Sequence, residues 1–322
     1  MSSILVVGGA GYIGAHIVDL LCDNDCNVIV LDNLSSGYRE NINENAKFVL
    51  GDICNKSDLR NILKNNKIES VIHMAAFKSV GVSNKKSNIY TQNNIIGSLN
   101  LISACVEFNI EQFIFSSTAA VYGDPLYNPI DEKHPINPIN HYGFTKSYIE
   151  NYLEWISTIK SIKFITLRYF NAAGYTAKKD LIKHKEKMPE NLLPIIMEVA
   201  TGEREILQVF GNDYDTVDGT CIRDYIHVLD LARAHIDALN YLKKYKKNSV
   251  VNLSTGKGTS VLEVIKIAEN YTSRKINYDF MDRRLGDPGT LISQYSKANN
   301  LFGWMPKYSM EDIVSSMWEM YR

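Results

Sequence analysis

The chain has 322 residues, of which 45% are hydrophobic and 22% charged, a composition typical of a globular protein large enough for two lobes. Its 35 basic and 36 acidic residues leave a net charge of −1, which argues against a nucleic-acid binder or a protein held on a membrane surface. The five cysteines are odd in number and scattered without CxxC pairs, so they indicate neither a disulfide framework nor a zinc site.

The start of the chain indicates a cytoplasmic protein. Residues 1–3 lead directly into an apolar run, without the basic segment and long apolar core of a secretory signal. No stretch approaches the ~20 consecutive apolar residues that a membrane span requires. We therefore expect no membrane partner, no bound metal and no nucleic-acid partner.

The first motif is a glycine-rich turn between a strand and a helix. Residues 4–7 are a β-branched run typical of a buried parallel strand, and residues 15–21 have helical spacing. The sequence GGAGYIG lies between them. In a dinucleotide-binding turn Gly8 permits the tight bend, Gly11 admits a pyrophosphate, and Gly14 lets the helix pack closely on the strand. A glycine-rich turn without a ligand is the alternative.

The next predicted strand favours NAD over NADP. Residues 27–31 are apolar and end in Asp32, eighteen residues after Gly14. A carboxylate at this place accepts hydrogen bonds from the adenosine ribose and repels a 2′-phosphate. The alternative is an aspartate that caps a turn, because Asp-Asn is common in turns.

Strand-like and helix-like segments continue to alternate through the first half of the chain. This alternation predicts an α/β fold with a Rossmann-type, doubly wound parallel sheet. The polar end of one strand places Thr118 where such sheets bind ligands, whereas His73 lies within an apolar run and is interpreted as a core histidine with satisfied hydrogen bonds. The predicted strands are 47–50, 70–76, 112–118 and 163–171, and the predicted helices are 57–65, 88–108 and 142–158.

Two residues in the third of these helices have the spacing of a proton-transfer pair. Tyr142 and Lys146 are four residues apart, so a helix places them on one face. A nearby ammonium favours the phenolate form of tyrosine, which suits proton transfer from a hydroxyl group. The same spacing is common on solvated helix faces, and a surface pair is the alternative.

Beyond Gly174 the alternation loosens. We predict a Rossmann domain over residues 1–174 and a smaller C-terminal substrate-binding α/β lobe over 175–322, with some later segments returning to the sheet. Residues 178–187 are interpreted as a charged, solvated loop. Helices are predicted at 192–201, 229–244, 261–271 and 310–321, and strands at 205–210, 250–253 and 275–280.

The sequence resembles the extended short-chain dehydrogenase/reductase family, and within it the UDP-hexose epimerases. The similarity runs nearly end to end and includes GGAGYIG, VIHMAA, FSST, AVYG, the Tyr142–Lys146 pair, LRYFN and FGNDY. Two further blocks, DGT at 218–220 and RDYIHV at 223–228, lie outside the cofactor half and are the most specific part.

The resemblance implies reversible epimerisation at C4 of a UDP-hexose such as UDP-glucose or UDP-galactose, in galactose metabolism, through a transient 4-keto intermediate with tightly bound NAD as hydride carrier. It implies that Tyr142 as phenolate takes the proton of the 4-hydroxyl, that Lys146 holds the nicotinamide ribose and keeps the pKa of Tyr142 low, and that Thr118 relays the proton.

The resemblance also implies the binding residues. It assigns NAD to Gly8, Gly11, Tyr12, Ile13, Gly14, Asp32, Asn33, Leu34, Ser35, Ser36, Gly37, Asp52, Ile53, Met74, Ala75, Ala76, Phe77, Lys78, Asn93, Tyr142, Lys146 and Phe170. It assigns the UDP-sugar to Thr118, Asn171, Asn191, Leu192, Gln208, Val209, Phe210, Arg223, Arg284, Asp287 and Leu291. Chemically, Arg223 and Arg284 can clamp a pyrophosphate, and the ring of Phe210 offers an apolar face for uracil or its ribose.

Three positions depart from the family's pattern. Thr118 stands where serine is common, Gln208 is larger than usual, and Leu291 is intermediate between the bulky and small residues of relatives. A bulky residue at the last position is linked in the family to exclusion of N-acetylated sugars. Acceptance of UDP-N-acetylhexosamines is therefore an open hypothesis.

Several alternatives remain open. A nucleotide-sugar 4,6-dehydratase needs an Asp-Glu pair directly after Thr118, where this chain has Ala119 and Ala120. A UDP-glucuronate 4-epimerase or decarboxylase could recruit Arg283 or Arg284. A cofactor-bound sensor without activity and an alcohol reductase that exchanges free NAD(H) are further possibilities. The helices at 88–108 and 142–158 are apolar on more than one side, so we also expect a homodimer with a four-helix interface.

Overall fold

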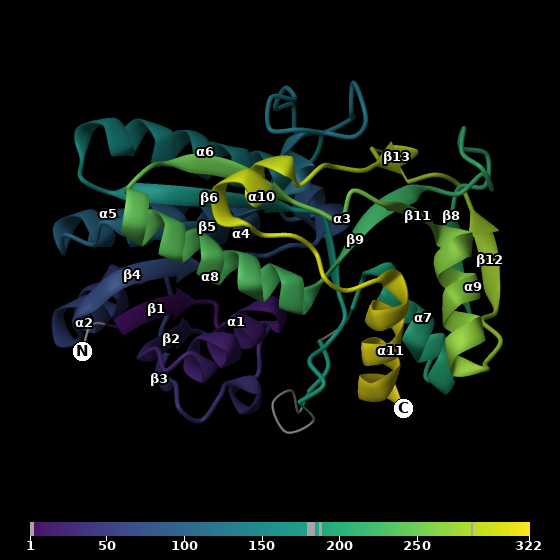
Figure 1. Ribbon diagram of the computed structural model, residues 1–322, viewed down its shortest axis with the longest axis horizontal. Coiled ribbons are helices and arrows are strands. Elements are labelled where there is room, and N and C mark those ends of the chain that lie inside the picture. The colour runs from purple at the N-terminus through teal and green to yellow at the C-terminus, as the bar shows by residue number, and fades with distance from the viewer. Residues whose placement is uncertain (1–2, 179–183, 187–188, 285) are drawn as a thin grey trace.

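A computed structural model describes residues 3–178, 184–186, 189–284 and 286–322. Figure 1 shows a large sheet flanked by helices beside a smaller group of strands and helices. The large sheet has seven parallel strands in the order β10-β6-β5-β4-β1-β2-β3, which confirms the predicted α/β fold with a doubly wound parallel sheet. The strands are β1 (Ser3–Val7), β2 (Val28–Asp32), β3 (Lys47–Leu50), β4 (Ile68–His73), β5 (Gln112–Thr118), β6 (Lys163–Tyr169) and β10 (Ser249–Leu253).

Helices cover both faces of this sheet, and alternate residues of each strand enter different cores. In β1, Ile4 and Val6 pack into one hydrophobic core, whereas Leu5 and Val7 pack into the other. The first core contains side chains of α1 (Tyr12–Asp23), α8 (Val228–Tyr245) and α10 (Ser296–Phe302). The second contains side chains of α2 (Lys56–Asn65), α5 (Ser98–Glu107) and α6 (His141–Ile159).

Two predicted strands end earlier than expected. β4 ends at His73, because the N–H groups of Met74 and Ala75 both donate to the carbonyl of Val7 at 2.8 and 3.0 Å and turn the chain away. β6 ends at Tyr169, and the following β7 (Asn171–Ala173) pairs with a strand of the other lobe. The chain therefore leaves the large sheet close to the proposed site.

The predicted helix over residues 88–108 is interrupted. It comprises α4 (Ser87–Tyr90), a π-helical turn η2 (Thr91–Gly97) and α5, and the short α3 (Val80–Lys85) precedes it. Gly97 lies close to Ile53, where a Cβ would approach Cγ1 of Ile53 to 2.6 Å. Wide turns of this kind are frequent at functional sites. This one directs the buried Asn94 towards the loop after β4.

Within the described residues, the part of the C-terminal lobe that does not return to the large sheet forms two small sheets and a group of helices. One sheet joins β7, β9 (Ile222–His227), β11 (Gly258–Ser260) and β13 (Thr290–Leu291), and the other pairs β8 (Leu207–Phe210) with β12 (Tyr278–Met281). A hydrophobic core joins α7 (Leu192–Thr201), α9 (Val261–Thr272) and α11 (Met310–Tyr321). The strand β9 was not predicted, because the charged pair at 223–224 interrupts its apolar pattern.

Later segments of the chain return to the large sheet. β10 pairs with β6 along its whole length, and α8 packs against α1, β5 and β6. The division of the chain at residue 174 remains a prediction. Within the described part of the chain, none of the helices is both long and apolar enough to cross a bilayer.

Candidate active site

Tyr142, Lys146 and Thr118 meet at the carboxyl end of β5. Thr118 is the last residue of that strand, and α6 begins directly before Tyr142, where the side chain of Asn140 accepts a hydrogen bond from Gly143 N at 2.8 Å. All three residues are buried: Thr118 is 9% exposed, Tyr142 8% and Lys146 4%. The Thr118 hydroxyl accepts a hydrogen bond from Ala120 N at 3.1 Å and acts on Tyr142 to lower its pKa. The interpretation as a solvated surface pair is therefore wrong.

Burial sets the proton affinities of this cluster. It raises the pKa of Tyr142 above its usual value, Tyr169 adds to the effect, and the Thr118 side chain opposes it. Burial lowers the pKa of Lys146 to about 7, against the opposing effect of the Glu150 carboxylate. Lys146 Nζ donates to the carbonyl of Ser116 at 2.8 Å and lies 6.0 Å from the centre of the Tyr142 ring.

The expectation that Lys146 keeps the pKa of Tyr142 low is not met in this structure. The ammonium contacts a backbone carbonyl and not the phenol oxygen, and the loss of solvation around the phenol outweighs the favourable effects. The lysine is nevertheless one helical turn from the tyrosine, as the spacing predicted.

The glycine turn has the close contacts expected of a dinucleotide cradle. Gly8 has a φ of +83°, and a Cβ there would lie 2.5 Å from Ala75 N. A Cβ on Gly14 would lie 2.2 Å from the carbonyl oxygen of Gly8. Gly11 precedes α1 and is the least crowded of the three, since its Cβ would be 3.3 Å from the same oxygen. The turn thus presents backbone and a helix N-terminus to an approaching phosphate.

Asp32 holds the loop after β2 against this turn. Its carboxylate accepts hydrogen bonds from Ala10 N at 3.0 Å and from Leu34 N at 2.8 Å. At the end of β3, Asp52 accepts a hydrogen bond from Asn33 Nδ2 at 2.9 Å. Burial opposes ionisation of Asp52, but hydrogen bonds from Asn33 and Cys54 outweigh it and lower its pKa. Three segments predicted to bind the adenosine are therefore adjacent.

Asn94 is a site residue that the sequence analysis did not identify. Its side-chain amide donates to Phe77 O and accepts from Phe77 N, both at 2.9 Å, and donates to Thr145 Oγ1 at 3.3 Å. It thereby ties the loop of residues 74–78 to α6, and Asn93 Nδ2 donates to it at 3.0 Å. An asparagine on the buried face of an apolar helix was the available signal, since buried amides need partners.

Histidine 73 is only partly satisfied, contrary to its interpretation as a fully bonded core histidine. Its Nε2 contacts Ser98 Oγ at 2.8 Å, whereas Nδ1 is buried without a hydrogen-bond partner among the described residues. Burial and the charge of Lys146 lower its pKa to about 3, so the imidazole is neutral at neutral pH.

The predicted diphosphate clamp lies in the C-terminal lobe. Arg223 on β9 forms an ion pair with Asp287 and donates to Ile222 O at 2.8 Å. The guanidinium of Arg284 lies over the ring of Phe210, 3.7 Å from its centre. Asp287 N donates to Arg284 O at 3.2 Å, so the residue that pairs with Arg223 also contacts the backbone of Arg284. The carboxylate that now pairs with Arg223 occupies hydrogen bonds that a phosphate could take.

The other predicted substrate residues lie on β7, β8 and β13 and at the start of α7. Leu291 on β13 pairs with Arg223 in register and packs with Phe170 and Ala119 beside Thr118. Asn171 donates to Asp224 O at 3.1 Å, and Asn191 precedes Leu192 at the start of α7. On β8, Gln208 is exposed, whereas Val209 is buried in the core of the lobe. The side chain of Val209 therefore faces away from any ligand at the surface of the strand.

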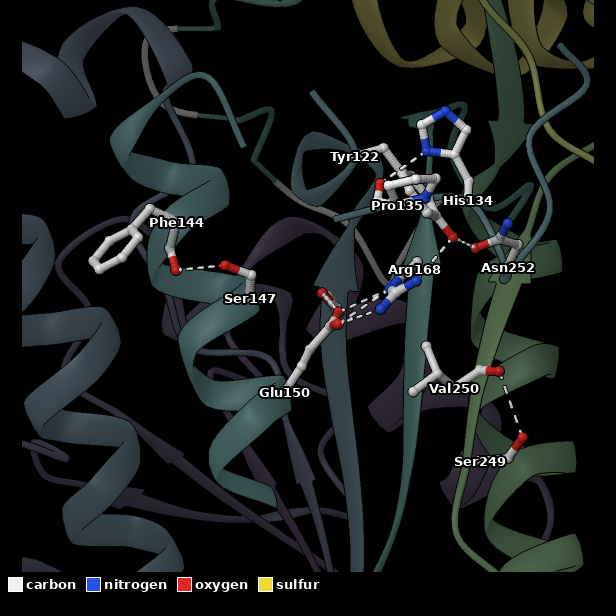
Figure 2. A network of polar contacts seen from close by, with 11 residues as sticks. Tyr122, His134, Pro135, Phe144, Ser147, Glu150, Arg168, Ser249, Val250 and Asn252 are labelled. Atoms are coloured by element: carbon white, nitrogen blue, oxygen red, sulfur yellow. Dashed lines mark hydrogen bonds and ion pairs between the residues drawn. The ribbon is translucent and has the colours of Figure 1, made fainter. Parts of the chain in front are cut away.

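A buried ion pair links α6, the helix that carries Tyr142 and Lys146, to the sheet. Glu150 on α6 accepts hydrogen bonds from Arg168 Nε at 3.1 and 3.2 Å, and Arg168 Nη1 donates to the Tyr122 hydroxyl at 3.0 Å (Figure 2). Tyr122 in turn donates to Asn252 Oδ1 at 2.6 Å. Arg168 appeared in the matched sequence LRYFN, but nothing in the sequence identified its partner. In the described part of the chain, no three His, Cys, Asp or Glu side chains could together hold a metal.

Comparison with known proteins identifies the family. The model of the NAD dependent epimerase/dehydratase family matches residues 4–254. A UDP-glucose 4-epimerase of Halalkalibacterium halodurans is 42% identical over 322 residues, which cover 99% of this chain and 96% of the relative.

Two solved structures are similar along the whole chain. The UDP-glucose-4-epimerase from Stenotrophomonas maltophila, with bound NAD and formylated UDP-arabinopyranose, has a TM-score of 0.96 at 35% identity and covers 100% of this chain and 98% of its own. The UDP-glucose 4-epimerase from Bifidobacterium longum, in complex with NAD+ and UDP, has a TM-score of 0.94 at 35% identity, with 99% and 98% covered. Fold, glycine turn and sequence agree, and the chain belongs to the NAD dependent epimerase/dehydratase family.

Proposed function

We propose that this protein is an isomerase that interconverts the C4 epimers of a UDP-hexose, UDP-glucose and UDP-galactose, with NAD bound throughout turnover. The observation that carries the proposal is the buried cluster of Tyr142, Lys146 and Thr118, with the glycine turn on one side and the arginines of the C-terminal lobe on the other. The names of the relatives, UDP-glucose 4-epimerases, support it.

The chain's own residues perform the proton transfer. In its phenolate form the Tyr142 oxygen takes the proton of the sugar 4-hydroxyl, and the Thr118 hydroxyl at the end of β5 can relay that proton. NAD, held by the glycine turn and the loops that follow β2, β3 and β4, would supply the reversible hydride acceptor for C4. We assign to Lys146 the role of holding the nicotinamide ribose. Ala119 and Ala120, which follow Thr118, supply no acid for a dehydration.

Arg223 and Arg284 hold the diphosphate while the 4-keto sugar rotates to present its other face to the cofactor. Guanidinium groups bind phosphate oxygens through paired, charge-assisted hydrogen bonds, which keeps the sugar's attachment point fixed during rotation. The ring of Phe210 beneath Arg284 offers a face for the uridine. We assign NAD to the glycine turn and the loops after β2, β3 and β4 in residues 1–174, and the UDP-sugar to residues 175–322, with α8 and β10 returning to the first lobe.

The product assay is direct. Purified protein is incubated with UDP-galactose, UDP-N-acetylgalactosamine or UDP-glucuronate without added NAD, and the nucleotide sugars are separated by anion-exchange chromatography. We expect UDP-glucose to form from UDP-galactose until the two epimers reach equilibrium. A 4-keto-6-deoxy product, or turnover that requires added NAD, would refute the proposal.

We also propose a homodimer that buries the outer face of α6. The outer face of α6 carries exposed, large apolar side chains, namely Phe144, Tyr148, Trp155 (66% exposed) and Ile159. Two more lie on preceding elements, Ile89 on α4 and Ile96 on η2. Helices with a second apolar face commonly pair across a two-fold axis. Sedimentation should show a dimer that Trp155→Glu dissociates, whereas Leu50→Glu, at an equally exposed position on β3, leaves it intact.

A further inference from the structure

Glu150 extends the face of α6 that carries the proposed catalytic pair. Tyr142, Lys146 and Glu150 are spaced four residues apart, and all three are buried. The carboxylate accepts hydrogen bonds from Arg168 and from the Ser117 hydroxyl (Figure 2 shows the first of these). The preceding carbonyl on the same strand, that of Ser116, accepts the hydrogen bond of Lys146 at 2.8 Å.

The ammonium of Lys146 therefore lies in a site where its charge needs support. Its hydrogen bond goes to a neutral carbonyl, and it lies 4.9 Å from the centre of the Phe115 ring. A charge buried in this way is unfavourable unless an opposite charge is close. Glu150, one turn along the helix, carries such a charge.

The other titratable groups around the lysine are neutral at neutral pH. Burial lowers the pKa of His73 on β4 to about 3 and that of His235 on α8 to about 4. Burial also raises the pKa of Tyr142, one turn away on α6, and the pKa values of two tyrosines that act on it, Tyr90 on α4 and Tyr169 on β6. Among the described residues named here, Glu150 and Arg168 carry the charges, and Arg168 forms an ion pair with the carboxylate of Glu150.

We propose that Glu150 is a positioning residue for the reaction proposed above: its carboxylate, fixed by Arg168 and Ser117, keeps Lys146 cationic beside Tyr142. The inference rests on the proposed function for its catalytic consequence, but the charge state of Lys146 can be measured without turnover. An exclusively structural role, in which the ion pair only joins α6 to β6, is the competing explanation.

The two roles differ in what the removal of the carboxylate does. Glu150→Gln keeps the size of the side chain and can still accept a hydrogen bond from Ser117, but it lacks the charge. A charge one helical turn away changes the proton affinity of a buried lysine by about tenfold, or about one pKa unit. Because Lys146 must be cationic, activity falls as the pH rises through its pKa, and the variant should lose activity at lower pH.

Tyr122→Phe is the matched control. It removes the hydroxyl that accepts from Arg168 and donates to Asn252, so it weakens the same network without removing the charge of Glu150. Both variants should unfold at a lower temperature than the wild type. Only Glu150→Gln should change the titration of Lys146.

The experiment records the titration of Lys146 by NMR in protein labelled with 13C at the lysine ε-carbon, with the signal assigned by its loss in Lys146→Met. We expect a midpoint near 7 in the wild type and after Tyr122→Phe, and one about a unit lower after Glu150→Gln. The high-pH decline of kcat for UDP-galactose should shift in parallel, while KM changes little. If Glu150→Gln does not fold, the neutral pair Glu150→Gln with Arg168→Met replaces it and should also titrate lower.

An unchanged Lys146 titration in the charge-removing variant, with only its thermal stability reduced, would overturn the inference and leave Glu150 a structural residue. The proposed function fails separately. If the wild type does not interconvert UDP-hexoses, the NMR titration still decides whether Glu150 sets the charge state of Lys146.

Discussion

Gly14→Ala should loosen the cofactor cradle although alanine favours helices. The added Cβ would lie 2.2 Å from the carbonyl oxygen of Gly8 and 2.8 Å from Gly9 Cα, both backbone atoms that cannot rotate away. Alanine in a helix gains about 1 kcal/mol over glycine, whereas overpacking of this kind costs typically about 1–3 kcal/mol or more. Because both clashing atoms belong to the backbone, we expect a cost in the upper part of this range, about 2–3 kcal/mol, and therefore a net loss of roughly 1–2 kcal/mol as α1 moves away from the turn.

Gly81→Ala in α3 is the control, because a Cβ there meets no described atom within 4 Å. It should keep the propensity gain of up to about 1 kcal/mol. At about 2–4 °C per kcal/mol for a large domain, the two variants should differ by roughly 5–10 °C in melting temperature.

The assay compares thermal unfolding with and without NAD. Ligand at 100 times its Kd adds about 2.7 kcal/mol of stability, which the wild type and Gly81→Ala should show in full. Gly14→Ala should show less, because the helix N-terminus that faces the phosphates has moved. If this variant melts at the temperature of Gly81→Ala and gains as much from NAD, the close packing of α1 on the turn is not what shapes the cradle.

Three further changes test the proposed roles. Tyr142→Phe should lower kcat by about 10²- to 10⁴-fold with KM for UDP-galactose nearly unchanged, and near-normal turnover would exclude the tyrosine as the proton acceptor. Arg284→Ala should raise KM about tenfold or more through loss of charge-assisted hydrogen bonds, whereas Arg283→Ala, which breaks an exposed ion pair, should change it less than about fivefold. Leu291→Tyr should abolish turnover of UDP-N-acetylgalactosamine and preserve that of UDP-galactose; if the wild type turns over only UDP-galactose, leucine at this position does not admit the N-acetyl group.

The glycine turn and the first strands could be predicted because their requirements are local. A positive φ at Gly8 and the contact at Gly14 involve neighbours in the same strand–turn–helix unit, so the residue types alone indicate the conformation. The buried strands β1 and β2 are continuous apolar runs of the kind that parallel sheets require. Thr118 was placed correctly at a strand end for the same reason.

Other features depend on partners that are distant in the chain. The strand β9 is stabilised by pairing with β7, β11 and β13. These partners are distant in the chain, so the local sequence, which contains charged residues, did not predict a strand. Within the wide turn η2, Gly97 lies against Ile53, a neighbour that the local sequence does not reveal.

The sequence by itself determined the parallel sheet, the cofactor turn and the one-turn spacing of Tyr142 and Lys146, because periodicity and backbone sterics act over a few residues. Only the tertiary structure decided that this pair is buried, that burial and not the lysine dominates the proton affinity of the tyrosine, and that Glu150 meets Arg168. Solvation and charge depend on which segments pack together, and that packing joins residues far apart in the chain.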